Sequence, residues 1–218
     1  LNSLKIDKPN NKELISILDE LEFRTIKERL ERIGLLKQAK DEQLSVFDND
    51  NKTTKVKVDY KIIDENKVDS LIKKLKVQKE ICFDTETSSL DIQSAKLAGI
   101  AFSCEEGKAY YVPTLSNTEE ILKKLSPLFS DSNILLIGHN LKYDIQILSK
   151  YGILFHENVF DTMLAHYVIS PEGSQKLDVL SENYLNHKCI PIEDVIGKKG
   201  VNQMSMIDIP VENVYEYC

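Results

Sequence analysis

The sequence predicts an α/β fold in which helices cover a β-sheet, with a short helical segment in front of it. Strand-like and helix-like patterns alternate from residue 59 onward, which is typical of a sheet covered by helices. Two of the apolar strand patterns lead directly into polar clusters, at residues 84–86 and 138–144. With 218 residues, 42% of them hydrophobic, the chain can bury a sizeable core.

Residues 1–57 are predicted to form an appendage and a linker rather than a domain. Apolar residues recur at helical spacing over 11–36, with Gly34 as a stop signal. Two short amphipathic helices cannot build a core alone, and residues 37–57 are polar and lysine-rich, as in a linker. We therefore place the main domain at residues 58–218.

Within the main domain the apolar pattern changes its period several times. Alternation and short apolar runs predict strands, whereas spacings of three and four predict helices. Residues 81–113 are predicted to form an antiparallel meander with a turn at 105–108. The predicted strands span 60–63, 81–86, 96–103, 109–112 and 133–137, with a short strand or turn at 159–160. The predicted helices span 65–77, 117–129, 140–150, 161–169, 176–186 and 211–217.

Net charge and cysteine content narrow the classes of protein. A formal net charge of −7 argues against a protein that coats nucleic acid through its bulk charge, although a local site can still bind nucleic acid. The 4 cysteines (Cys82, Cys104, Cys189 and Cys218) are widely spaced and indicate neither a zinc site nor a disulfide framework. Because no apolar run is long enough for a membrane span and no signal peptide is evident, we expect a cytoplasmic protein without a membrane partner. Leu1 and the abrupt stop at Cys218 lead us to expect a piece of a longer protein.

The first polar cluster places two carboxylates at the end of a buried strand. Side chains two residues apart in a strand point to the same face, so Asp84 and Glu86 project together while Thr85 points the other way. Two carboxylates held this close repel each other and lose solvation, and a divalent cation is the usual compensation. The alternative is a strand that simply ends in a solvated acidic turn.

The second polar cluster follows another buried strand and opens a helix. Asn140 and Asp144 are four residues apart and share one helix face, beside free backbone N–H groups that can meet a ligand. A third carboxylate is thus presented at the end of a central strand. The alternative is that Asn140 only caps the helix and Asp144 is an exposed helix residue.

Taken together, the two clusters resemble the first two motifs of the proofreading 3′–5′ exonucleases. The resemblance is most specific to the editing domain of bacterial DNA polymerase I, and it covers about residues 58–218. Residues 18–24 resemble the tail of the preceding 5′-nuclease region of the same polymerases. The strings that carry the likeness to the editing domain are residues 83–91, 140–144, 160–164, 176–181 and 197–200.

This resemblance implies a fold, a reaction and a set of metal ligands. The fold would be a ribonuclease H-like mixed sheet flanked by helices, and the reaction would be hydrolysis of the 3′-terminal phosphodiester with two Mg²⁺ or Mn²⁺ ions. By position, Asp84 would bridge both ions, Glu86 would bind one of them and touch the terminal 3′-hydroxyl, and Asp144 would hold the second ion through water.

The resemblance also implies contacts to the substrate. Leu90 would wedge beside the terminal base, while Asn140 and Tyr143 would position the terminal nucleotides. Thr85 and His139 complete the predicted substrate-binding set. Such stacking and backbone contacts to a frayed strand tolerate any sequence, as editing requires.

The third motif of the family is incomplete in this chain. It consists of a tyrosine that orients the attacking water and an aspartate four residues later that completes the metal site. Tyr217 aligns with the tyrosine, so the aspartate would fall past Cys218. We therefore expect weak metal binding and little nuclease activity from the 218-residue chain, although the parent polymerase should edit.

The expected partners are the 3′ end of DNA and a polymerase domain in the same polypeptide, in a monomeric bacterial cytoplasmic protein. Two other functions remain open. One is an RNA-trimming exonuclease of the same superfamily, and the other is a non-catalytic scaffold that binds nucleic acid. Among the remaining acids, Asp161 is predicted to cap the helix that follows it rather than bind metal.

Overall fold

The computed structural model describes residues 10–21, 23, 26–27, 29–30, 36, 58–198, 200 and 203–218, and the side chain of Asp19 is not among them. The chain divides into two compact units, residues 1–52 and 53–218. In the first unit, helix α1 (Asn11–Glu20) covers the start of the predicted helical segment, and residues 26, 27, 29 and 30 are also helical. The predicted linker at 37–57 and part of the string at 197–200 lie outside the described residues.

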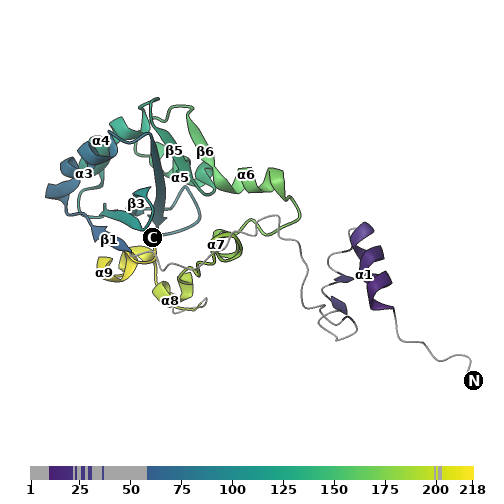
Figure 1. The fold of residues 1–218 in the computed structure, drawn as a ribbon. Coiled ribbons are helices and arrows are strands. Elements are labelled where there is room, and N and C mark those ends of the chain that lie inside the picture. Colours follow the sequence, from purple (N-terminus) through teal and green to yellow (C-terminus); the bar gives the residue numbers. More distant parts are fainter. Residues whose placement is uncertain are drawn as a thin grey trace, which may run out of the picture. The chain divides into compact units, whose positions relative to one another are not determined.

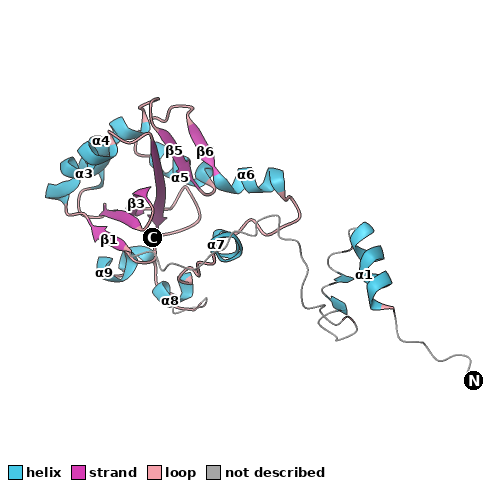
Figure 2. Cartoon of the chain, viewed as in Figure 1, coloured by secondary structure: helices cyan, strands magenta, loops and turns pink. Residues whose placement is uncertain are grey.

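The second unit is built on a mixed sheet of six strands in the order β1-β4-β3-β2-β5-β6 (Figure 2). Strands β2, β3 and β4 pair antiparallel, which confirms the predicted meander, whereas β1 pairs parallel with β4, β5 with β2 and β6 with β5. The strands are β1 (Asp59–Ile62), β2 (Glu80–Thr87), β3 (Leu97–Glu105), β4 (Lys108–Pro113), β5 (Leu135–Gly138) and β6 (Val159–Asp161).

Helices cover both faces of this sheet (Figure 1). The helices of this unit are η2 (Glu65–Lys67, 3₁₀), α3 (Val68–Leu75), α4 (Thr118–Phe129), α5 (Leu141–Ser149), α6 (Thr162–Ile169), α7 (Leu177–Leu185), α8 (Ile192–Ile196), η3 (Met206–Asp208, 3₁₀) and α9 (Val211–Val214). The predicted helix at 211–217 is wrong in its extent, because α9 ends at Val214 and residues 215–217 form a turn.

The main core lies between the sheet and helices α3, α4 and α5. Along β2, Ile81, Phe83 and Thr85 are buried on this side, while Cys82 and Asp84 alternate with them and point to the other face. Phe129 at the end of α4 is fully buried, with its ring centroid 5.2 Å from that of Phe83. This alternation fixes the register of β2, so that the carboxylates of Asp84 and Glu86 face away from the main core.

A smaller apolar cluster holds the C-terminal segment on the other face of the sheet. Ala101 and Tyr111 from the sheet pack there with Met206 and Val214. Gly99 lies opposite Glu86 in the β2–β3 ladder, and a Cβ atom at Gly99 would overlap the ring of Tyr111. Small residues on β3 therefore make room beside the acidic end of β2 for the Tyr111 ring and for α9.

Candidate active site

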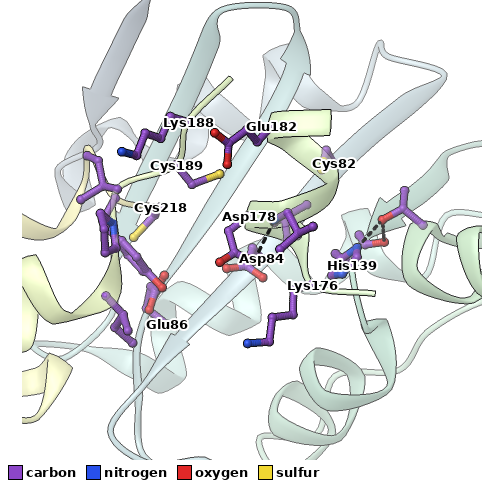
Figure 3. A pocket seen from close by; sticks show the side chains of 18 of the residues that line it. Cys82, Asp84, Glu86, His139, Lys176, Asp178, Glu182, Lys188, Cys189 and Cys218 are labelled. Atoms are coloured by element: carbon purple, nitrogen blue, oxygen red, sulfur yellow. Dashed lines mark hydrogen bonds between the residues drawn. The ribbon is translucent and has the colours of Figure 1, made fainter. Parts of the chain in front are cut away.

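The acidic end of β2 opens into a cavity of about 780 Å³. Asp84 and Glu86 line it from β2, and Tyr217 and Cys218 line it from the turn after α9. Because Asp84 and Glu86 are two residues apart on one strand, both project into the same space (Figure 3). The predicted placement of the two carboxylates on one face is confirmed.

The two carboxylates lie in an environment that disfavours their charge. Burial raises the pKa of Asp84 well above its ordinary range, and the negative charges of Asp144 and Glu86 raise it further. Burial also raises the pKa of Glu86 to about 7, although a hydrogen bond with the Cys218 thiol opposes the shift. A divalent cation would stabilise the ionised forms of these carboxylates, because it offsets their lost solvation and their mutual repulsion.

Asp144 is the third acidic residue, and it is held by the backbone of β2. It lies in the first turn of α5 and is 3% exposed, so the alternative of an exposed helix residue is wrong. Its Oδ1 accepts hydrogen bonds from the Thr85 backbone N–H (3.0 Å) and the Thr85 hydroxyl (2.6 Å). Burial raises the pKa of Asp144, and these two bonds oppose the rise.

The two hydrogen bonds to Asp144 give Thr85 a structural role. Its side chain is buried and points to the opposite face from Asp84 and Glu86, as the alternation predicts. The hydroxyl donates to Asp144 and thereby ties α5 to β2. A contact between Thr85 and the substrate stays a prediction.

Asn140 occupies the N-cap position of α5 in the left-handed conformation, with φ of 65°. Its side chain makes no capping hydrogen bond, so the alternative that Asn140 only caps the helix is wrong. Tyr143 donates its hydroxyl proton to the carbonyl of Ser89 (2.7 Å), at the base of the loop that carries Leu90. Leu90 itself is 89% exposed. The substrate contacts of Asn140, Tyr143 and Leu90 stay predictions.

His139 lies at the end of β5 and lines the cavity. Its Nδ1 is 2.9 Å from the Thr162 hydroxyl, and its Nε2 is 2.8 Å from the Gln175 carbonyl. Because a carbonyl only accepts, Nε2 carries a proton that it donates to Gln175. His139 therefore links β5 to the segment before α7, and its contact to substrate stays a prediction.

Tyr217 lies beside the acidic pair, as the sequence predicts. Burial raises the pKa of its phenol, and the charges of Glu86 and Asp84 raise it further. The phenol therefore keeps its proton at neutral pH and can donate a hydrogen bond into the cavity.

The far wall of the cavity was not predicted as part of the site. Figure 3 shows Lys176, Asp178 and Glu182 near the start of α7, and Lys188 and Cys189 beyond it, facing the acidic end of β2. The string at 176–181 was recognised in the sequence, but no role followed from it. Two lysines thus stand near a site that is otherwise strongly acidic.

The donor set fits a hydrated divalent cation better than a fully protein-bound one. Among the residues that the structure describes, no three His, Cys, Asp or Glu side chains converge closely enough to hold a metal ion. Asp84 and Glu86 form a pair, while one oxygen of Asp144 is occupied by Thr85. Mg²⁺ keeps several waters and needs only one or two carboxylates, so this pair with a water-mediated third acid is compatible with it.

The fold has close counterparts among solved structures. The catalytic core of RRP6 from Trypanosoma brucei superimposes with a TM-score of 0.56 at 18% sequence identity, over 75% of this chain and 46% of that one. Escherichia coli RNase D, described as an exoribonuclease involved in structured RNA processing, gives a TM-score of 0.55 at 17% identity, over 63% of this chain and 36% of that one. These likenesses define the class of fold and confirm the predicted ribonuclease H-like architecture.

Sequence comparison then defines the family. A 3′–5′ exonuclease family model matches residues 60–218. DNA polymerase I of Pseudomonas aeruginosa PAO1 is 32% identical over 100% of this chain and 24% of its own length. DNA polymerase I of Borreliella burgdorferi is 39% identical over 79% of this chain and 19% of its own length. The chain belongs to the family of 3′–5′ exonuclease domains of DNA polymerase I, and it spans about a quarter or less of these relatives.

Across residues 58–198 and the other described positions, no helix has the length and apolar character needed to cross a membrane.

Proposed function

We propose that this domain removes nucleotides from the 3′ end of DNA and so edits the product of a polymerase domain in the same polypeptide. The observation that carries the proposal is the meeting of Asp84, Glu86 and Tyr217 at one cavity, with Asp144 directly behind them. This set lies in a chain that belongs to a 3′–5′ exonuclease family. In the proposal the parent protein acts as a monomer in the bacterial cytoplasm.

Mg²⁺ or Mn²⁺, held by Asp84 and Glu86 with support from Asp144, would supply the Lewis acid that activates water and stabilises the leaving 3′ oxygen. The protein residues prepare the site for this chemistry. Thr85 fixes the carboxylate of Asp144 through two hydrogen bonds. Tyr217 is a phenol at neutral pH, as any tyrosine is, and burial raises its pKa further, so its O–H can orient the attacking water.

The residues around the cavity suit a frayed single strand of any base sequence. Leu90 is almost fully exposed and can lie against the terminal base, and the amide of Asn140 is not used as a cap. Lys176 and Lys188 line the cavity and can meet phosphate oxygens. Apolar and backbone contacts of this kind read no sequence, which fits an editing function.

A second candidate is trimming of RNA from its 3′ end. The observation in its favour is the similarity in fold to a solved exoribonuclease, Escherichia coli RNase D. The likeness in sequence to DNA polymerase I extends over the whole chain, however, and it favours DNA. A non-catalytic scaffold is the least favoured function, because Asp84, Glu86 and Asp144 are all present at the site.

The test is Mn²⁺-dependent degradation of a 5′-labelled single strand, offered as DNA and as RNA of the same sequence. The assay is run on the 218-residue chain and on a chain extended past Cys218, because the resemblance implies that the aspartate of the third motif would fall there. We expect stepwise shortening of DNA from its 3′ end by the extended chain, and a much lower rate from the 218-residue chain.

Two variants serve as controls. Asp84→Ala should abolish shortening, whereas Asp131→Ala, which alters a surface turn, should leave it unchanged. Faster degradation of RNA than of DNA would replace the proposal with the second candidate. No degradation by either chain, with Mn²⁺ binding also absent in calorimetry, would leave the scaffold function.

A further inference from the structure

One carboxylate outside the acidic pair ties two helix starts together. Asp161 lies at the end of β6, and its side chain accepts four backbone N–H groups. Two come from the start of α6, Met163 (2.9 Å) and Leu164 (3.2 Å), so the predicted cap of that helix is confirmed. The other two come from the start of α5, Asn140 (3.1 Å) and Leu141 (2.9 Å).

The second pair of hydrogen bonds ties down the start of α5, where the N-cap side chain makes no bond. The first N–H groups of a helix have no partner within the helix, and the N-cap side chain normally supplies one. At α5 the N-cap residue is Asn140, whose side chain makes no such bond. Asp161 on β6 instead accepts the N–H groups of Asn140 and Leu141, and the Asn140 amide is left to face other groups.

The start of α5 sets the position of the third acidic residue. Asp144 lies in the first turn of the helix, and its carboxylate accepts hydrogen bonds from the N–H and hydroxyl of Thr85 on β2. The Asn140 backbone is left-handed, a conformation that costs some energy for a residue other than glycine, although asparagine adopts it more readily than most. The Asp161 bonds to Asn140 and Leu141 help to hold this conformation.

We propose that Asp161 is a positioning residue of the nuclease site, which fixes Asp144 and leaves the Asn140 amide to the substrate by capping α5 from outside. This inference rests on the proposed function for its effect on catalysis. Its structural content, the dependence of Asp144 on Asp161, stands on the hydrogen bonds alone.

The two oxygens of Asp161 accept different N–H groups, so one substitution can weaken the start of one helix and preserve the other. Oδ1 receives Asn140, Met163 and Leu164, whereas Oδ2 receives only Leu141. An asparagine with its oxygen in place of Oδ1 keeps the cap of α6 and turns an NH₂ group toward the Leu141 N–H. Asp161→Asn is therefore expected to weaken the start of α5 while it preserves the start of α6.

Backbone amide NMR of the full chain tests the structural part without any need for activity. In Asp161→Asn, hydrogen exchange of the Leu141 amide should accelerate by about tenfold, because this amide loses its one acceptor. Exchange of the Met163 amide should stay unchanged. The Thr85 amide is the reporter for Asp144, because it donates to the Asp144 carboxylate from another strand. Its resonance should shift in Asp161→Asn.

The matched control is Asp131→Ala, which removes a carboxylate from the Asn133 N–H in a surface turn. It should leave Leu141 and Thr85 unchanged. If both amides are unchanged in Asp161→Asn, or if they change equally in Asp131→Ala, the inference is overturned. Asp161→Asn retains a good capping residue, so the variant is expected to fold.

The functional part is measured on the form of the protein that degrades DNA in the assay above. The Mn²⁺ concentration for half-maximal rate should rise at least about tenfold in Asp161→Asn, as is typical when a group that orients a metal-binding side chain is lost. A lower folding stability with an unchanged Mn²⁺ requirement would overturn the positioning role. If the unaltered protein shows no nuclease activity, the proposed function fails, while the Thr85 amide still decides whether Asp161 positions Asp144.

Discussion

The buried acids predict that the metal-free protein loses stability as the pH rises through the range from about 4.5 to about 7. Glu86 has an ordinary pKa of 4.5, and burial raises it to about 7 in the folded protein. Between these values the folded protein keeps a proton that the unfolded chain has released. Unfolding then releases a proton, so a higher pH favours the unfolded state. The penalty is absent below pH 4.5 and complete above pH 7.

The magnitude follows from the two pKa values of Glu86. Each pKa unit corresponds to about 1.36 kcal/mol, so a rise from 4.5 to about 7 lowers the free energy of unfolding by about 3 kcal/mol. The residue is only 8% exposed, so solvent screens little of this effect. Asp84 and Asp144 also have raised pKa values and act with the same sign. Since domains of this size are typically stable by about 5–15 kcal/mol, the loss is readily measurable.

The assay is urea unfolding at pH 5 and pH 7.5 in the presence of a chelator. Glu86→Gln is the matched variant, because it keeps the size of the side chain and cannot ionise. The free energy of unfolding of Glu86→Gln should depend less on pH than that of the original chain. At pH 7.5 the variant should be the more stable of the two. Equal stability of the original chain at both pH values, or the same pH dependence in Glu86→Gln, would refute the reasoning. Mn²⁺ at 100 times its Kd should restore about 2.7 kcal/mol at pH 7.5.

Three further changes have outcomes set by packing and hydrogen bonds. Gly99→Ala places a Cβ atom inside the buried Tyr111 ring, and urea unfolding should show a loss of about 1–3 kcal/mol, whereas no loss would mean that the ring moves freely. Lys150→Met removes an ammonium group that donates to three carbonyls of residues 92–95, so the Leu90 loop should become more sensitive to proteolysis while the melting temperature changes little. Phe129→Ala removes a fully buried ring and should destabilise the protein by about 3–5 kcal/mol in the same unfolding assay.

Local periodicity was sufficient to predict the part of the site that lies on a single strand. The alternation along β2 places Asp84 and Glu86 on one face and Thr85 on the other, because a strand has a period of two whatever the rest of the fold does. In the same way, the spacing of Asn140 and Asp144 on one helix needed only the helical period. These predictions depended on neighbours within one element.

Contacts between elements could not be read from the same patterns. The bonds from Thr85 to Asp144, and from Asn140 and Leu141 to Asp161, join residues about 20 to 60 positions apart. Asp161 illustrates the difference. Its cap on α6 follows from the residues beside it, but its cap on α5 exists only because β5 and β6 are parallel neighbours that end at the same edge. The lysines of the far wall were missed for the same reason.

The acidic end of β2 and the packing around it oppose each other in energy. At neutral pH the buried carboxylates repel one another and lose solvation, which favours opening of this end of the sheet. The bonds from Thr85 hold Asp144 from the opposite face of β2, and the bonds to Asp161 hold the start of the helix that carries Asp144. A site built in this way is already assembled before a cation arrives. Cation binding then relieves repulsion instead of ordering the chain, so metal binding should raise stability more than it changes the fold.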